Sequence, residues 1–188
     1  QVSKITQIPF LPITTFKNLK VAAGCFSEEM IFTSSGTTST ANSKHYVKNL
    51  SVYETSFVAA FELFYGKVSD YRVLALLPSY LDRKGSSLVY MADRFIQESR
   101  FDESGFFLDN VEELYQILNT LNESQEKVLL LGVSFALLDF VEKYNTKPNS
   151  NLIVMETGGM KGRKKEMIRE ELHSTLRRGF SVDSVHSE

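Results

Sequence analysis

A turn rich in hydroxyl groups around one glycine is the feature of this sequence best suited to chemistry. It follows the apolar residues 30–32 and consists of Thr33, Ser34, Ser35, Gly36, Thr37, Thr38 and Ser39. Hydroxyl and backbone N–H groups can surround phosphate oxygens where a glycine allows the backbone to approach closely, and Lys44 can add a positive charge. The Gly-Lys-Ser/Thr ending of a Walker A loop is missing. The residue types therefore predict either a phosphate site of another kind or an ordinary polar loop.

A second candidate turn lies further along the chain, where two glycines follow an apolar run. This turn contains Gly158, Gly159, Met160 and Lys161. Open α/β sheets bind their ligands at the carboxyl ends of the strands, and the bare backbone of two glycines leaves room for a flat purine ring. A plain strand-to-helix turn is the alternative interpretation.

The elements that must position these turns begin with four short apolar runs. They predict strands at residues 30–33, 72–77, 128–131 and 152–155. The runs do not alternate with polar residues, which is typical of strands that are covered on both faces in a largely parallel sheet.

Apolar residues at helical spacing predict four helices in the remaining sequence. The first starts at Ser51 with capping-box spacing, and its apolar residues are Tyr53, Phe57, Ala60, Phe61 and Phe64. The second carries Val111, Leu114, Leu118 and Leu121. The third covers residues 135–144. The fourth covers residues 163–178, with Ile168, Leu172 and Leu176 on one face and Gly179 as its stop.

The alternation of strands and helices predicts a layered α/β domain with a largely parallel sheet flanked by helices. We expect residues 29–188 to form a nucleotide-binding core. Residues 1–28 differ, because Pro9 and Pro12 interrupt their apolar run. A segment of this kind is extended, and we expect it to pack on the core.

The overall composition excludes several classes of protein. The chain of 188 residues has a net charge of -2, which favours neither nucleic acid nor an anionic membrane as a partner. No apolar run approaches the roughly 18 residues that a membrane span needs. Basic residues at 161–165 are followed by acidic ones, as on a solvated helix face. Cys25 is the single cysteine, which rules out an internal disulfide or a cysteine-rich metal site and predicts a cytoplasmic location.

Three segments resemble the acyl-adenylate-forming superfamily. Residues 33–38 look like its phosphate-binding signature, although Ser39 stands where the family usually has glycine and Lys44 lies two positions late. Residues 8–13, followed by Phe16 and Lys17, are similar to the segment before that loop in phenylacetate-CoA ligases and acyl-protein synthetases. Residues 156–162 resemble the Gly-Gly-x-Lys turn of the acyl-protein synthetase (LuxE-like) branch, which borders the adenine and acyl pocket. The likeness covers about residues 8–188 and implies part of the large N-terminal domain of these enzymes.

The resemblance implies ATP and Mg²⁺ as cofactors and a fatty or aryl carboxylic acid as substrate. The acid would be activated as an acyl-adenylate, and its acyl group would pass to a thiol on a protein or carrier. Residues 34–39 and 158–161 would bind the nucleotide, and Lys44 and His186 are the candidate catalytic residues. The family's acidic magnesium ligand lies in a Tyr-Gly-x-Thr-Glu motif that this sequence lacks and that would follow Glu188. We therefore expect no metal ligand in this chain, a core that is incomplete at its C-terminal end, and no activity from the chain alone.

Two other interpretations remain open. The chain can be a degenerate module that binds a nucleotide or a partner without catalysis, which the serine at position 39 favours. It can also be a serine hydrolase, because Gly132-Val133-Ser134 approximates a nucleophile elbow, with Asp139 and either His173 or His186 completing a triad. Against the hydrolase, Ala136 replaces the final glycine and Asp139 belongs to the helix that follows the elbow. Outside a hydrolase, Ser134 is expected to cap that helix or line a pocket.

Overall fold

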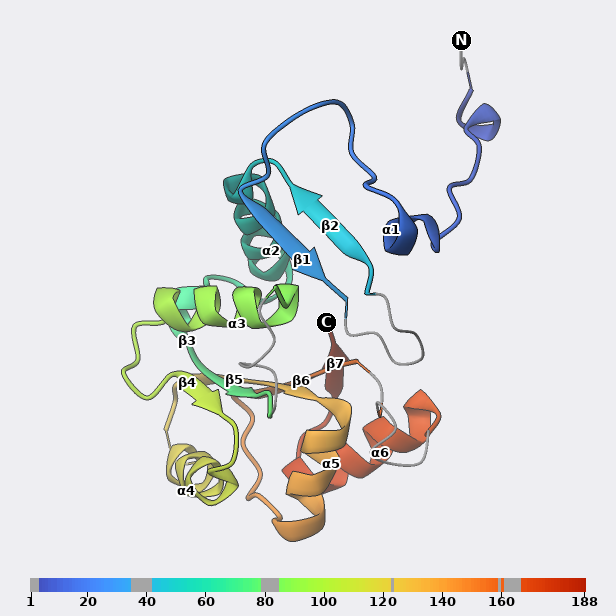
Figure 1. Ribbon diagram of the computed structural model, residues 1–188. Helices are drawn as coiled ribbons and strands as arrows, with labels where there is room; N and C mark the ends of the chain where they lie inside the picture. Colours follow the sequence, from blue (N-terminus) through green and yellow to red (C-terminus); the bar gives the residue numbers. More distant parts are fainter. Residues whose placement is uncertain (1–3, 35–41, 79–84, 123, 159, 161–166) are drawn as a thin grey trace.

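A parallel five-stranded sheet with helices on both faces forms the body of the protein (Figure 1). The structure, a computed structural model, describes residues 4–34, 42–78, 85–122, 124–158, 160 and 167–188. The strands are β3 (Tyr71–Leu76), β4 (Gly105–Phe107), β5 (Lys127–Val133), β6 (Leu152–Thr157) and β7 (Val185–Ser187), in the order β4-β3-β5-β6-β7. All their pairings are parallel. The predicted layered α/β fold is therefore confirmed.

The predicted runs at 72–77, 128–131 and 152–155 correspond to β3, β5 and β6, the three central strands. Every residue of β3 is buried, and so is every residue of β5 after Lys127. Burial on both faces explains why these strands read as unbroken apolar runs. The edge strands β4 and β7 were not predicted, because three residues give no periodic pattern to detect.

The helices divide between the two faces of the sheet, as right-handed crossovers require. Those on one face are α2 (Leu50–Tyr65) and α3 (Ser87–Glu98), and those on the other are α4 (Val111–Leu121), α5 (Ser134–Lys143) and α6 (Arg169–Phe180) (Figure 1). Shorter turns are η1 (Ile5–Gln7), α1 (Thr15–Asn18) and η2 (Val68–Asp70). The prediction missed α3, although Met91, Ala92 and Phe95 form its buried face and Ser86 caps it by accepting the backbone N–H of Val89.

The first predicted strand is real, but it does not belong to the parallel sheet. β1 (Met30–Thr33) pairs antiparallel with β2 (Lys44–Val47) in a separate hairpin. The link between these strands is too short for a parallel pair, which needs a crossover of a dozen or more residues. The hairpin is anchored beside the start of α3, because the Thr33 N–H donates at 2.8 Å to the carbonyl of Gly85, two residues before that helix. A side chain at Gly85 would strain its positive φ of 87° and crowd β1.

Three helix ends differ from the predictions. Asn49, rather than Ser51, caps α2, and its side chain accepts the Ser51 N–H at 3.0 Å. The described part of α6 starts at Arg169, so Ile168 precedes the helix and is exposed. Gly179 does not end α6. It lies inside the last turn, and Ser181 provides the left-handed cap instead. An added Cβ at Gly179 would lie 2.3 Å from Val141 Cβ, so this glycine serves the close packing of α6 on α5.

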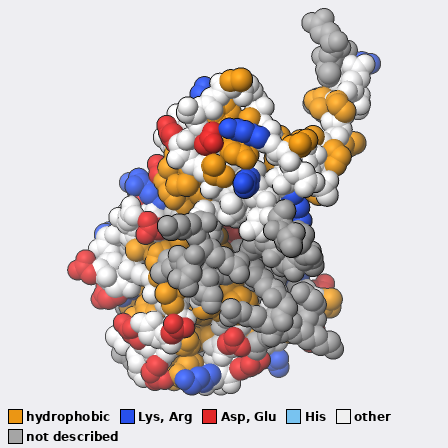
Figure 2. Space-filling model, in the orientation of Figure 1, with side chains coloured by type: hydrophobic (Ala, Val, Ile, Leu, Met, Phe, Trp, Pro, Cys, Tyr) orange, Lys and Arg blue, Asp and Glu red, His pale blue; other side chains and the backbone are white. Residues whose placement is uncertain are grey.

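Large apolar side chains remain exposed near the N-terminus and on α2. The N-terminal segment extends away from the body (Figures 1 and 2). Phe10 is completely exposed, and Ile8, Leu11 and Ile13 are more than half exposed, so the expectation that this segment packs on the core is wrong for these residues. On α2 the predicted face is buried at Phe61, whereas Phe64 and Ala60 face solvent.

Candidate functional site

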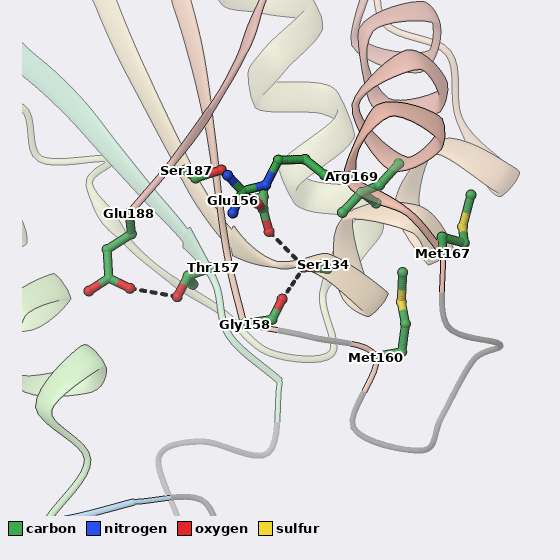
Figure 3. Close-up of a pocket in the computed structure, with 10 residues that line it drawn as sticks. Ser134, Glu156, Thr157, Gly158, Met160, Met167, Arg169, Ser187 and Glu188 are labelled. Atoms are coloured by element: carbon green, nitrogen blue, oxygen red, sulfur yellow. Dashed lines mark hydrogen bonds between the residues drawn. The ribbon is translucent and has the colours of Figure 1, made fainter. Parts of the chain in front are cut away.

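Polar groups converge on one cavity at the carboxyl edge of the sheet. The cavity has a volume of about 320 Å³ and lies where β6 and β7 end, beside the first turns of α5 and α6 (Figure 3). Its lining consists of Ser134, Glu156, Thr157, Gly158, Met160, Met167, Arg169, Leu172, Ser187 and Glu188. Carboxyl ends of parallel strands are where open α/β sheets hold their ligands.

Glu156 is the centre of the hydrogen bonds around this cavity. Its carboxylate is buried, with 6% of the residue exposed. Oε2 accepts a hydrogen bond from the hydroxyl of Ser134 (2.8 Å), and Oε1 accepts one from the hydroxyl of Ser187 (2.7 Å). His173 Nε2 lies 3.4 Å from Oε1. Buried carboxylates are costly unless they are well hydrogen-bonded, and these donors from three elements meet that need.

The turn from β5 into α5 places Ser134 at the floor of the cavity. An added Cβ at Gly132 would lie 2.7 Å from Leu137 Cδ2, so the glycine allows the helix to fold back tightly on the strand. Ser134 is the first residue of α5 and is 1% exposed. Besides Glu156, its hydroxyl contacts the carbonyl oxygen of Gly158 as a donor. Ser134 thus lines the cavity, as predicted, but makes no side-chain cap to its helix.

The ends of β6 and β7 are joined side by side at the cavity. The hydroxyl of Thr157 donates to Glu188 Oε2 at 2.7 Å, and the backbone N–H of Glu188 donates to the carbonyl of Glu156 at 3.1 Å. Gly158 then turns away with a φ of 71°, a conformation that L side chains rarely adopt. The last residues of both strands are therefore held in fixed positions relative to the turn at Gly158.

The wall of the cavity that is formed by α6 and by the residues before it combines a cation with apolar groups. Arg169 extends from the start of α6 toward Ser187, while Met160 and Met167 lie on the other side of the opening (Figure 3). Thioether side chains adapt to ligands of different shape, and a guanidinium suits an anionic group. The cavity therefore has the character of a site for a ligand with both anionic and flat or apolar parts.

The hydroxyl-rich turn is described only at its base. Residues 35–39, predicted to bind phosphate, lie outside the described residues, as do Gly159 and Lys161. Ser34 and Lys44, at the two sides of the hairpin, are exposed. The Ser34 N–H donates to the Ser43 carbonyl, and the Ser34 hydroxyl accepts the Ser43 N–H, each at 3.0 Å.

The base of the hairpin and the end of β7 share a neighbour, Tyr53. The ring of Phe32 in β1 lies 4.9 Å from the ring of Tyr53. Burial raises the pKa of Tyr53; a hydrogen bond with the Ser87 side chain lowers it, and the negative charge of Glu188 raises it. Glu188 is thus close enough to act electrostatically on a side chain that packs against the hairpin. Tyr53 therefore lies near both the hairpin and the end of β7.

The predicted site residues are distributed unevenly around this cavity. Gly158 and Met160 line it. His186 does not, because its ring lies on the other side of β7, where Nδ1 is 2.9 Å from the Tyr65 hydroxyl. The prediction missed Glu156 as a site residue. The available signal was the position of this carboxylate at the end of an otherwise apolar, buried strand, because burying a carboxylate costs free energy.

The hydrolase triad is not assembled in the described structure. The hydroxyl of Ser134 shares its one proton between a carboxylate and a carbonyl rather than donating it to a histidine, and it has almost no contact with solvent. His173 contacts Glu156, and His186 contacts Tyr65 and Ser184. A buried serine without a histidine base is a poor nucleophile.

A second cavity, of about 370 Å³, opens where the strand order reverses between β3 and β5. Its walls include the apolar side chains of Leu76, Phe135 and Phe140. Its lining also includes charged side chains such as Glu112 and Lys143. The cavity at β6 and β7 is the better candidate, because several hydrogen bonds meet there at a buried carboxylate.

Comparisons with family models, curated proteins and solved structures find no match to this chain. Within the described residues, no helix is both long and apolar enough to cross a membrane. Nor does any group of three or more His, Cys, Asp or Glu side chains in that part of the chain offer a site for a metal ion.

Proposed function

We propose that this protein takes part in the ATP-dependent activation of a carboxylic acid, followed by transfer of the acyl group to a thiol. The observation that supports the proposal is a convergence in space. The segments that resemble the acyl-adenylate-forming enzymes, residues 33–38 and 156–162, are far apart in the sequence. Their described parts both lie near Tyr53, whose ring packs on Phe32 in the hairpin and whose hydroxyl is affected by the charge of Glu188 at the end of β7.

The proposed reaction has two steps, adenylation of the acid and transfer of the acyl group. An oxygen of the substrate carboxylate bonds to the α-phosphorus of ATP, and the bond from that phosphorus to pyrophosphate breaks. The thiolate of the acceptor then bonds to the acyl carbon, and AMP leaves. Both steps depend on positioning and on neutralising phosphate charge.

The residues available for this work fit the substrates. The exposed hydroxyl of Ser34 and the ammonium of Lys44 lie at the base of the predicted phosphate turn, and Mg²⁺ would accompany the phosphates of ATP. The bare backbone at Gly158 suits a purine ring, and Arg169 offers a positive charge to an anionic group. Met160, Met167 and Leu172 provide apolar surface for a fatty or aryl chain.

Acid-dependent exchange of radioactive pyrophosphate into ATP tests the proposal on the full-length protein. A panel of fatty and aryl acids should include at least one that raises exchange well above the rate without acid. ATP binding without exchange for any acid would instead indicate a non-catalytic nucleotide-binding module. Absence of ATP binding in the presence of Mg²⁺ would contradict the proposal altogether.

A matched pair of lysine variants tests the phosphate turn. Lys44 lies at its base and Lys48 lies just beyond β2, and both are exposed. Lys44→Ala should raise the KM for ATP about tenfold, the scale of losing one charge-assisted hydrogen bond, whereas Lys48→Ala should leave it unchanged. Equal effects of the two variants would exclude a specific role for Lys44.

A further inference from the structure

Glu156 links the start of α5 to the end of β7 through its side chain, in addition to the backbone pairing of the sheet. Its two carboxylate oxygens hold the hydroxyl of Ser134, at the start of α5, and that of Ser187, in β7. Ser134 directly follows β5 and Ser187 ends β7, and these are the two strands on either side of β6. A third neighbour, His173 in α6, lies 3.4 Å from Oε1.

The same carboxylate controls both walls of the cavity. Through Ser134 it fixes the carbonyl of Gly158, because that hydroxyl also contacts the Gly158 oxygen. Through Ser187 it fixes the end of β7, where Glu188 is held by Thr157 and by the backbone of Glu156. The turn at Gly158 and the carboxylate of Glu188 lie at the cavity (Figure 3).

The carboxyl group suits this role because it can accept hydrogen bonds on both oxygens at once. Glutamine would offer one acceptor and one donor, but it can still serve both partners. Its amide nitrogen can donate to the Ser134 oxygen, which continues to donate to Gly158, and its carbonyl can accept from Ser187. Alanine would break both links. We call the hydrogen bonds from Glu156 to Ser134 and Ser187 the bridge. Glu156→Ala removes both the bridge and the charge, whereas Glu156→Gln removes only the charge, so the two variants show which of them the reaction needs.

We infer that Glu156 is a positioning residue, which holds the turn at Gly158 and the end of β7 in the arrangement that the reaction requires. This inference rests on the proposed acyl-adenylate chemistry. Glu156 itself is buried, and it acts through the two hydroxyls that are hydrogen-bonded to it. Reactions that depend on orientation lose rate when the supporting residues shift by about an ångström.

The test measures exchange kinetics of Glu156→Ala and Glu156→Gln in the full-length protein, with rates expressed per ATP-binding site. We expect kcat to fall about 30-fold in the alanine variant, with the KM for ATP changed less than about threefold, since an interaction needed in the transition state is lost. Glutamine should restore the rate to within about threefold of the unmodified protein. Glu171→Ala, an exposed change on α6, is the control and should leave the rate unchanged.

A purely structural role would reduce the number of ATP-binding sites and leave the rate per site intact, so that result would overturn the inference. A Gln variant as slow as the Ala variant would also contradict it. If Glu156→Ala does not fold, Ser187→Ala removes one link at an exposed residue and should lower the rate per site about fivefold. An unchanged rate in Ser187→Ala would then overturn the inference.

Amide hydrogen exchange separates failure of this inference from failure of the proposed function. In Glu156→Ala, backbone amides at 157–160 and 185–188 should exchange at least about tenfold faster, while those of β3 should not change. If the unmodified protein shows no acid-dependent reaction but this pattern appears, the proposed function fails and the bridge stands. If the reaction occurs but neither exchange pattern nor rate responds to Glu156→Ala, the bridge fails and the proposed function stands.

Discussion

Helices α2 and α6 cover opposite faces of the same sheet, and their burial is the reverse of what their composition suggests. α6 is mostly polar, yet Leu176 and Phe180 are completely buried and the ring of Phe180 stacks on Phe140 of α5 at 5.2 Å. α2 is far richer in apolar residues, yet Phe61 alone is fully buried among its described residues, and Leu63 and Phe64 are each more than three-quarters exposed.

The difference shows that packing against the sheet, rather than apolar content, decides where stability is concentrated. α6 lies close to α5 because Gly179 has no side chain to separate them. α2 rests on the sheet partly through α3, with the rings of Phe57 and Phe95 5.6 Å apart. We therefore expect substitutions on the α5–α6 side to cost far more free energy of unfolding than matching substitutions on the outer face of α2.

The largest effect should come from the same phenylalanine change made on both helices. Phe180→Ala should lower the free energy of unfolding by about 3–5 kcal/mol, because it leaves a cavity in a packed region. Phe64→Ala should change it by less than about 0.5 kcal/mol, as at other exposed sites. Urea unfolding measures both values, and similar losses would show that the outer face of α2 is buried in solution.

The glycine contact between α5 and α6 should give the next largest effect. Gly179→Ala forces a Cβ against Val141 and should cost about 1–3 kcal/mol, as overpacking does. Gly105→Ala is the control, because an added Cβ there meets no atom within 4 Å. A neutral Gly179→Ala would mean that the two helices can separate without penalty, and that the α5–α6 side is less tightly packed than its geometry indicates.

The cap of α2 tests how much that helix contributes by itself. Asn49→Ala removes the side chain that accepts the Ser51 N–H and should cost about 1 kcal/mol. Ser51→Ala should cost less, since the Ser51 hydroxyl donates to Asn49 rather than capping the helix. The reverse order of the two values in urea unfolding would favour the capping box predicted from the sequence.

The smallest effect concerns the contact between α2 and α3 at alkaline pH. The hydrogen bond from the Tyr90 hydroxyl to Glu54, with burial, raises the pKa of Tyr90 to about 12 from 10.0. The folded state therefore holds the proton more tightly than the unfolded state, so the associated stability is complete below pH 10 and is lost as the pH rises toward 12.

Tyr90→Phe should consequently weaken the decline in stability between about pH 10 and about pH 12, measured by urea unfolding in a series of buffers. Glu54→Gln should also reduce the decline, because it removes the carboxylate that raises the pKa. An unchanged decline in both variants would show that this contact does not stabilise the pairing of α2 with α3.

Several elements could be predicted because their signal lies within a few neighbouring residues. The three central strands are buried on both faces, so their sequences are apolar throughout. The helix at 111–121 has its buried residues Leu114, Leu118 and Leu121 at helical spacing. β1 has the same apolar signal, but that signal does not identify the strand with which it pairs. β1 pairs with β2 in a hairpin instead of joining the parallel sheet.

The candidate site could be predicted only in part. The turn at Gly158 was recognised because glycines after a buried strand have a local meaning. The places of Glu156 and Ser187 at the cavity were missed, since each is an ordinary polar residue until the other is beside it. Gly179 was assigned to a helix end, because the sequence contains nothing that identifies Val141 as its neighbour.

The sequence by itself determined the α/β class, the central strands and most helices, because backbone hydrogen bonding and apolar periodicity act over a few residues. Only the tertiary structure decided that β6 lies between β5 and β7, and hence that the carboxylate of Glu156 meets the hydroxyls of Ser134 and Ser187. It likewise decided which face of α2 is covered. These outcomes depend on the order of strands and on contacts between distant residues, which no local pattern specifies.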